Sequence, residues 1–198
     1  YDHSLDSLSN LRLIITNSTF FPPETIRKLR SMLKTGMVAT YYGLTEASRS
    51  TFMIFNDDKK IESVGIPSDG IEIKIDTKIK NDDIGEIWIR GPNVIDNYWK
   101  KEYSENKSGE WLKTGDLGKF DNEGFLYILG RVDDLINVSG EKVYPQEIER
   151  IVKVLSGIDE VIAVPMKHKS FGEVVKLFVK KSRDSKINSG DILAYCIK

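Results

Sequence analysis

The sequence has very few cysteines and histidines, the residues that form disulfides and zinc sites. Its one cysteine, Cys196, excludes an internal disulfide, and we expect a protein of a reducing, cytoplasmic compartment. Cys196 lies in a short amphipathic run, where a buried structural cysteine is more usual than a nucleophile. The two histidines, His3 and His168, are too few and too far apart in the sequence to predict a zinc site.

Neither charge nor hydropathy is concentrated in any part of the chain. The 29 Lys and Arg residues nearly balance the 30 Asp and Glu residues and are scattered, so we expect no nucleic-acid partner. The apolar runs are too short for a transmembrane segment, and residues 1–4 do not resemble a signal peptide. Because the chain begins with Tyr and stops within the helix-like pattern at 192–197, we expect a piece of a longer polypeptide.

The first part of the chain has the pattern of a parallel sheet. An apolar run at 11–16 has the length of a strand, and Pro22 and Pro23 open a helix that extends to about residue 33. A second buried-type strand is predicted at 37–41. Strand, helix and strand in this order predict a βαβ unit.

The middle of the chain has a different period. Residues 71–75 and 84–90 alternate apolar and polar side chains, which predicts half-exposed antiparallel strands. A hairpin around the Asp-Asn-Glu-Gly turn at 121–124 continues this all-β region.

After Arg131 the pattern becomes that of a small α+β unit. We expect a strand at 135–138, a helix that starts at Pro145, strands at 161–164 and 174–179, and a final helix after residue 188.

The predicted fold class is therefore mixed α/β and α+β. The end of a large α/β domain with an antiparallel β subdomain occupies residues 1–130, and a small, incomplete α+β lid domain occupies residues 131–198.

An acid and a guanidinium stand at the two ends of the predicted hairpin. Residues 114–116 read Thr-Gly-Asp, and residues 130–134 read Gly-Arg-Val-Asp-Asp. A carboxylate from Asp116 accepts both protons of a vicinal diol and Arg131 donates to the same oxygens, which suits a ribose. The alternative is an ordinary hairpin turn, with Arg131 paired to a neighbouring acid on the surface.

A second group of side chains that could bind a ligand follows the strand at 37–41. At residues 42–46, Tyr-Gly-Leu-Thr-Glu, Tyr42 can stack on a purine, Thr45 can bond a phosphate oxygen, and Glu46 can hold Mg²⁺. Strand ends of this kind carry ligand-binding groups in α/β folds. The alternative is that Thr45 caps a helix that begins there.

A third segment, residues 137–149, joins a glycine bend to the predicted helix. Gly140 allows a tight bend or a close approach, and Lys142 can reach a phosphate. The alternative is a β-turn with a solvated lysine.

These segments together resemble the adenylate-forming superfamily, which includes acyl-CoA synthetases, luciferases and the adenylation domains of peptide synthetases. The resemblance covers nearly the whole chain. It rests on four motifs in the family's order, at residues 42–46, 85–91, 111–116 and 130–149.

The resemblance implies a role for each candidate residue of the large domain. Tyr42 and Ile128 would lie at the adenine, and Asp116 and Arg131 at the ribose. The implied contacts of the acyl pocket, the phosphates and Mg²⁺ are Ser18, Thr19, Gly43, Thr45 and Glu46, with Glu46 as the metal ligand and Thr45 and Glu46 as the catalytic pair.

It also implies roles in the lid. Asp133 would be the hinge about which the small domain turns, Gly140 the glycine that lets the pantetheine arm pass, and Lys142 a nucleotide or coenzyme contact.

The implied activity is that of an ATP-dependent carboxylate–CoA ligase of fatty acid metabolism, which uses ATP, Mg²⁺, coenzyme A and a carboxylic acid. Two alternatives stay open: an adenylation domain or ligase that loads a carrier protein, and a non-catalytic nucleotide-binding relative.

Some features depart from the family. Residues 17–21, Asn-Ser-Thr-Phe-Phe, are bulkier than its usual small-residue loop. The loop that holds the outer phosphates and the late catalytic lysine are absent, so Lys198 receives no role. We expect the missing N-terminal part of the same polypeptide to be the chain's main partner, and the fragment alone to be inactive.

Overall fold

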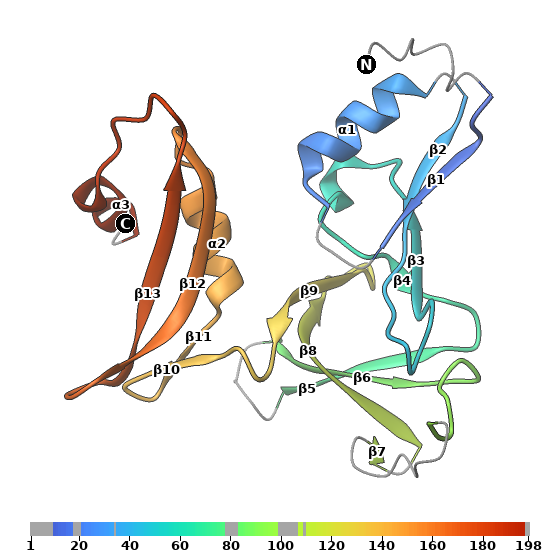
Figure 1. Ribbon diagram of the computed structural model, residues 1–198. Coiled ribbons are helices and arrows are strands. Elements are labelled where there is room, and N and C mark those ends of the chain that lie inside the picture. The colour runs from blue at the N-terminus through green and yellow to red at the C-terminus, as the bar shows by residue number, and fades with distance from the viewer. Residues whose placement is uncertain are drawn as a thin grey trace. The chain divides into compact units, whose positions relative to one another are not determined.

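The computed structural model describes residues 10–17, 21–33, 35–77, 83–98, 107–108 and 110–196. The chain divides into two compact units, Tyr1–Ile128 and Leu129–Lys198 (Figure 1). The domain boundary expected between residues 130 and 131 stays a prediction.

The first unit starts with the predicted βαβ element. Strand β1 (Leu13–Thr16) lies parallel to β2 (Met37–Thr40), and helix α1 (Pro23–Met32) connects them. Proline stands at the first helical position, where its missing N–H costs no intrahelical hydrogen bond. The βαβ prediction is confirmed, with each strand slightly shorter than expected.

Two short antiparallel strands extend this sheet. β3 (Thr51–Ile54) pairs with β2, and β4 (Ile66–Pro67) pairs with β3. A single 3-10 turn, η2 (Asp58–Lys60), lies between them. Neither strand was predicted from the sequence pattern.

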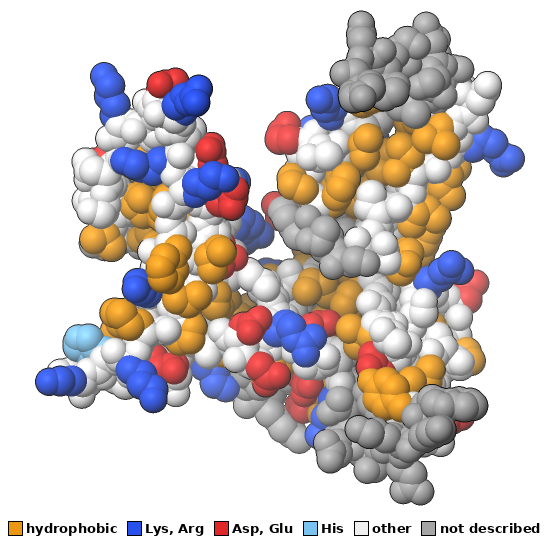
Figure 2. All heavy atoms as spheres, in the orientation of Figure 1, with side chains coloured by type: hydrophobic (Ala, Val, Ile, Leu, Met, Phe, Trp, Pro, Cys, Tyr) orange, Lys and Arg blue, Asp and Glu red, His pale blue; other side chains and the backbone are white. Residues whose placement is uncertain are grey.

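One face of this sheet is packed against a helix, and the other face is exposed. One face packs under α1 in a core formed by Ile26, Leu33, Val38, Met53, Phe55 and Ile61. On the opposite face, Figure 2 shows hydrophobic side chains gathered over these strands. The large apolar side chains that stay exposed there are Leu13, Ile15, Met37, Phe52, Ile54 and Ile66.

The second sheet of this unit is antiparallel, as predicted. Its strand order is β5 (Glu72–Asp76), β6 (Gly85–Arg90), β8 (Trp111–Phe120) and β7 (Lys107–Ser108), and β9 (Leu126–Arg131) also pairs with β8. Its apolar face forms a separate core around Ile87, Ile89, Leu112 and Leu126.

The second unit is a small α+β sandwich. Its sheet has the order β11 (Glu141–Val143), β10 (Ile136–Val138), β13 (Gly172–Lys181) and β12 (Ile158–His168). Helices α2 (Pro145–Lys153) and α3 (Ser189–Cys196) complete the unit, and Val152 and Ile192 from these helices share a core with Ile158. The observed elements confirm the mixed fold class.

Cys196 corrects one expectation. It is exposed at the end of α3, because that helix buries Ile192 instead. Among the helices of the described residues, none has the length and apolarity needed to cross a membrane.

Candidate functional site

After β2 the chain reaches Tyr42, whose backbone is held by two hydrogen bonds to Thr51. The N–H of Tyr42 donates to Thr51 Oγ1 at 3.1 Å, and the N–H of Thr51 donates back to the Tyr42 carbonyl at 3.2 Å. The next residue, Gly43, has no room for a side chain, since an added Cβ would lie 2.5 Å from the Arg49 nitrogen. Glycine is therefore needed here for close backbone approach.

Beyond Gly43 the chain makes a turn and no helix. The backbone groups of Leu44 and Ala47 exchange hydrogen bonds of 3.0 and 3.3 Å, and Thr45 and Glu46 lie in the bend between them. The alternative in which Thr45 caps a helix is therefore wrong, because the chain next enters β3. The Thr45 side chain is exposed, so its hydroxyl is accessible.

The Tyr42 side chain reaches the second sheet. Its hydroxyl donates to Asp116 Oδ2 at 2.6 Å, across 74 residues of sequence. Tyr42 is 9% exposed and Asp116 is 7% exposed, so the bond lies inside the unit. The structure thus brings together the 42–46 motif and the Thr-Gly-Asp motif.

Asp116 is held by a bulge in β8. Glu86 pairs with Leu117 and Trp88 pairs with Lys113, so residues 114–116 lie opposite Ile87 alone. Bulges bend a strand and re-aim side chains, and they are common beside active sites. Gly115 has φ 72°, which favours glycine.

Thr114 stabilises this bulge with its side chain. Its hydroxyl donates to the Ile87 carbonyl at 2.8 Å and accepts from the Asp116 N–H at 3.0 Å. Backbone groups that the bulge removes from the ladder thus find a side-chain partner. Thr114 was not among the predicted site residues, although its place in the Thr-Gly-Asp motif was the available signal.

Glu46 is half-buried and is held by its neighbours. The Tyr98 hydroxyl donates to its carboxylate, and the Ile95 N–H donates to its carbonyl at 2.9 Å. Among the described residues, no cluster of three or more His, Cys, Asp or Glu side chains forms a metal cage. A carboxylate oxygen is a ligand type that Mg²⁺ prefers, and the role of Glu46 as a metal ligand stays a prediction.

The carboxyl ends of β1 and β2 meet at a polar contact. Asn17 Nδ2 donates to the Tyr41 hydroxyl at 2.5 Å. The sequence pattern does not link these two residues. The next candidates, Ser18 and Thr19, lie outside the described residues, so their roles stay predictions.

Ile128 packs, partly buried, against the hydrophobic core that includes Tyr42. The two residues expected at the adenine therefore share one cluster. Their contact with a base stays a prediction.

The β8–β9 turn is tied by an ion pair to the η2 turn, which lies between β3 and β4. Lys60 Nζ donates to Asp121 at 2.6 Å and to Glu123 at 2.7 Å. Burial by itself would raise the pKa of Asp121, but hydrogen bonds from Lys60 and from the Phe125 and Glu123 amides lower it to about 2. The hydrogen bond to Asp121 is in turn the main cause that raises the pKa of Lys60.

In the second unit, Arg131 and Asp133 occupy one turn. Arg131 ends β9, and its carbonyl accepts the Asp134 N–H at 3.3 Å. Asp133 is exposed within this turn, which is a suitable place for a hinge. The pairing of Arg131 with Asp116 on one ribose stays a prediction.

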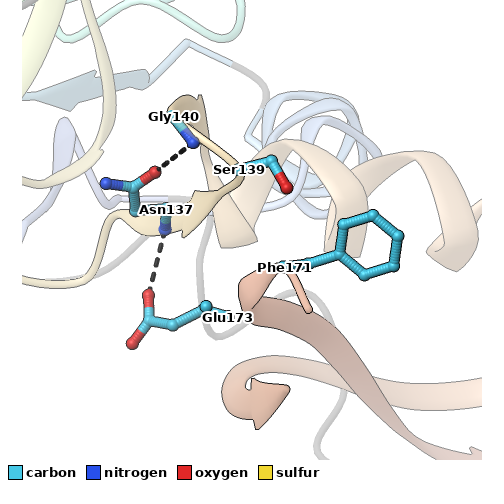
Figure 3. A pocket seen from close by; sticks show the side chains of 6 residues that line it. Asn137, Ser139, Gly140, Phe171 and Glu173 are labelled. Atoms are coloured by element: carbon cyan, nitrogen blue, oxygen red, sulfur yellow. Dashed lines mark hydrogen bonds between the residues drawn. The ribbon is translucent and has the colours of Figure 1, made fainter. Parts of the chain in front are cut away.

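Gly140 lines a hollow in the second unit (Figure 3). The residue has φ 94°, and an added Cβ would meet nothing within 4 Å. The other lining residues are Asn137, Ser139, Phe171, Gly172 and Glu173. Asn137 supports the loop, since its Oδ1 accepts the Gly140 N–H at 2.8 Å while its own N–H donates to Glu173 at 3.1 Å.

Lys142 lies on β11 opposite Asn137 and is exposed. The β-turn alternative for this segment is partly right, because residues 139 and 140 form a turn. The alternative did not include strands β10 and β11, which pair with each other on the two sides of this turn.

Comparison with known proteins places this geometry in a family. The model of the family described as AMP-binding enzyme matches residues 2–99, which include β1, α1, β2 and the 42–46 motif. The chain belongs to the adenylate-forming family of AMP-binding enzymes.

Its relatives include CoA ligases. A long-chain-fatty-acid–CoA ligase of Salmonella typhimurium is 38% identical over 78% of this chain and 29% of its own length. A 2-succinylbenzoate–CoA ligase of Lactococcus lactis is 37% identical over 86% of this chain and 37% of its own length. The chain thus spans well under half the length of these relatives.

Solved structures of adenylate-forming enzymes also align with the chain. An o-succinylbenzoate CoA synthetase from Bacillus subtilis, in complex with its acyl-adenylate intermediate, aligns with TM-score 0.80 and 31% identity over 98% of this chain and 42% of its own. ATP-bound MatB from Rhodopseudomonas palustris aligns with TM-score 0.80 and 31% identity over 93% of this chain and 38% of its own.

Proposed function

We propose that the chain is part of an ATP-dependent carboxylate–CoA ligase. A carboxylate oxygen attacks the α-phosphorus of ATP, and pyrophosphate leaves. The thiol sulfur of coenzyme A then attacks the acyl carbon of the resulting acyl-adenylate and releases AMP. The buried Asp116 carboxylate, bonded to Tyr42 of the 42–46 motif in a member of the AMP-binding family, carries the proposal.

Asp116 and Arg131 bind the ribose in this proposal. The carboxylate accepts the protons of both hydroxyls, and the guanidinium donates to their oxygens. The burial of Asp116 supports this role, because a hydrogen bond from a hydroxyl to a carboxylate is stronger where water is excluded. Tyr42 and Ile128 lie at the adenine.

Thr45 and Glu46 serve the phosphates. The exposed Thr45 hydroxyl donates to a phosphate oxygen. Glu46 would hold Mg²⁺, which would neutralise phosphate charge. Gly43 keeps the turn tight enough to present both side chains. Ser18 and Thr19 complete the small-residue loop beside the acyl pocket.

The small domain, residues 131–198, acts as the lid and thiol site. It turns about Asp133 between the two half-reactions, and Gly140 leaves space for the pantetheine arm, because no atom lies within 4 Å of where its Cβ would stand. The exposed Phe171 ring gives the same hollow an apolar wall, and Lys142 reaches a phosphate of the nucleotide or the coenzyme.

Further polypeptide covers the exposed apolar face of the first sheet. Sheets with parallel strands are usually buried on both faces, and here α1 covers only one. The relatives' greater length supports a continuation of the same chain as the cover. The acid is a fatty acid in a cytoplasmic pathway, and the 198-residue chain by itself is predicted to turn over no acid.

The test is a two-step assay of the full polypeptide that carries this sequence. It is incubated with Mg·ATP and a panel of acids that includes fatty acids and 2-succinylbenzoate, and released pyrophosphate is measured. Coenzyme A is then added, and the thioester is identified by mass spectrometry. Asp116→Asn is run in parallel.

We expect acid-dependent pyrophosphate release and a CoA thioester, both weakened by Asp116→Asn. Acylation of a carrier protein but not of coenzyme A would contradict the CoA assignment. Nucleotide binding without pyrophosphate release from any acid would indicate a non-catalytic relative.

A further inference from the structure

We infer that Glu86 is a positioning residue for the Asp116 carboxylate. The inference rests on the proposed function, because it concerns the grip of Asp116 on a ribose diol. Glu86 lies in β6 and pairs with Leu117, the residue of β8 that directly follows the bulge carrying Asp116. It acts through Gly115, the residue next to Asp116 in sequence.

The Glu86 carboxylate bridges two N–H donors. Its Oε1 accepts the backbone N–H of Gly115 at 3.1 Å, and its Oε2 accepts the indole N–H of Trp88 at 2.9 Å. Gly115 is the residue with φ 72° in the bulge. Glu86 therefore holds the peptide group whose orientation sets where the Asp116 backbone goes.

Trp88 gives this bridge a fixed anchor. The ring is 9% exposed and lies under the ammonium groups of Lys74 and Lys113, at 4.5 and 5.2 Å from its centroid. Cations over an indole face favour this ring position. A carboxylate hydrogen-bonded to this buried side chain holds the Gly115 amide more firmly than a solvated one would.

The bridge requires a carboxylate rather than an amide. Both partners are donors, and an ionised glutamate offers an acceptor oxygen to each. A glutamine would present its NH₂ group to one of them, so either the Gly115 amide or the indole would lose its partner. The Thr114 hydroxyl, which bonds to the Ile87 carbonyl and the Asp116 amide, would then hold the bulge without this second support.

The ordinary interpretation is that Glu86 only satisfies the Trp88 indole and stabilises the sheet. If that were its only role, Glu86→Gln would lower the melting temperature and would weaken the binding of both mimics equally. A positioning role instead weakens the part of the affinity that depends on the diol, because only that part needs Asp116 in its place.

The experiment uses the full polypeptide and two non-hydrolysable acyl-adenylate mimics, one with an intact ribose and one whose ribose lacks both hydroxyls. The ratio of their dissociation constants measures the diol contribution. It is determined for the wild type, Glu86→Gln, Trp88→Phe and the double variant. Glu72→Gln is the matched control, since exposed Glu72 lies in the same sheet and pairs with Arg90, away from the bulge.

Glu86→Gln is expected to reduce the diol contribution about tenfold, whereas Glu72→Gln leaves it unchanged. Adding Trp88→Phe to Glu86→Gln removes the second donor, so the glutamine oxygen can turn to Gly115. The diol contribution should then return to within about threefold of that of Trp88→Phe alone.

Equal weakening of both mimics by Glu86→Gln, or no rescue in the double variant, would overturn the positioning role. Asp116→Asn separates this outcome from failure of the proposed function. If Asp116→Asn leaves the diol contribution intact, the ribose assignment itself is wrong. If it abolishes the contribution and Glu86→Gln does not reduce it, only the inference about Glu86 is wrong.

Discussion

The hydroxyl of Tyr42 donates to Asp116 Oδ2 at 2.6 Å and thereby joins two sheets of one compact unit. One partner follows the parallel strand β2, and the other lies in the bulge of the antiparallel strand β8. The hydrogen bond fixes one oxygen of the acid that we assign to the ribose. The position of Asp116 therefore depends on the aromatic residue proposed for the adenine.

Tyr42→Phe should destabilise the protein and weaken nucleotide binding together. The variant leaves a buried carboxylate oxygen without this donor, which costs about 1–3 kcal/mol. Urea unfolding of the full polypeptide gives the free energy change. Tyr41→Phe is the control: its hydroxyl bonds exposed Asn17, so we expect a loss of less than about 1 kcal/mol. Equal losses in the two variants would show that the Tyr42 bond has no special weight.

Gly115→Ala should damage the site more than it damages the fold. At φ 72° an alanine costs about 1–2 kcal/mol in backbone strain, and relief of that strain would move Asp116. Gly124→Ala is a matched control, because its φ is 82° and a Cβ there meets nothing within 4 Å. Both should lose similar stability, but only Gly115→Ala should lose affinity for an acyl-adenylate mimic. A similar loss of affinity in Gly124→Ala would contradict a specific role for the bulge.

The Lys60–Asp121 pair should give the protein an acid-dependent stability. The pKa of Asp121 falls from 3.8 to about 2 on folding, so its contribution is complete above about pH 4 and is lost as the pH falls through about 2. Asp121→Asn should flatten the dependence of the urea midpoint on pH across this window. Glu123→Gln removes the second, more exposed acid that pairs with Lys60, and it should change that slope less. An unchanged slope in Asp121→Asn would contradict the assignment.

Gly140→Ala should separate the two half-reactions. The added methyl group meets no atom but narrows the hollow, and φ 94° adds strain within the loop. We expect thioester formation to slow at least about tenfold while acid-dependent pyrophosphate release stays within about twofold. Single-turnover measurement of each step provides the check. Equal slowing of both steps would argue against a thiol path beside Gly140.

Local sequence predicted most of the regular elements for physical reasons that the structure retains. Pro23 marks the start of α1, Pro145 marks the start of α2, and the Asp-x-x-Gly turn at 121–124 closes the β8–β9 hairpin. The strands at 161–164 and 174–179 were predicted too short. Pro165 continues in β12 because β12 is the edge strand of its sheet, where proline removes no ladder bond that the sheet requires.

The site could be predicted only as separate motifs. Sequence motifs identified Tyr42 and Asp116, but their hydrogen bond joins residues 74 positions apart on two different sheets, and the local pattern does not contain that long-range contact. The same is true of Glu86, whose role arises because the bulge begins next to its own pairing position. Strand β3 was missed although residues 52–55 read Phe-Met-Ile-Phe, because the period of such a short apolar run does not distinguish a buried strand from a helix segment.

The most direct test of the central claim, that Asp116 binds a ribose diol, is a calorimetric titration of the full polypeptide. A non-hydrolysable acyl-adenylate mimic is compared with one that lacks both ribose hydroxyls, in the wild type, Asp116→Asn and the control Asp121→Asn. We expect the wild type and Asp121→Asn to prefer the intact ribose at least about tenfold, and Asp116→Asn to bind both mimics alike. A wild type without this preference, or an Asp116→Asn variant that keeps it, would contradict the claim.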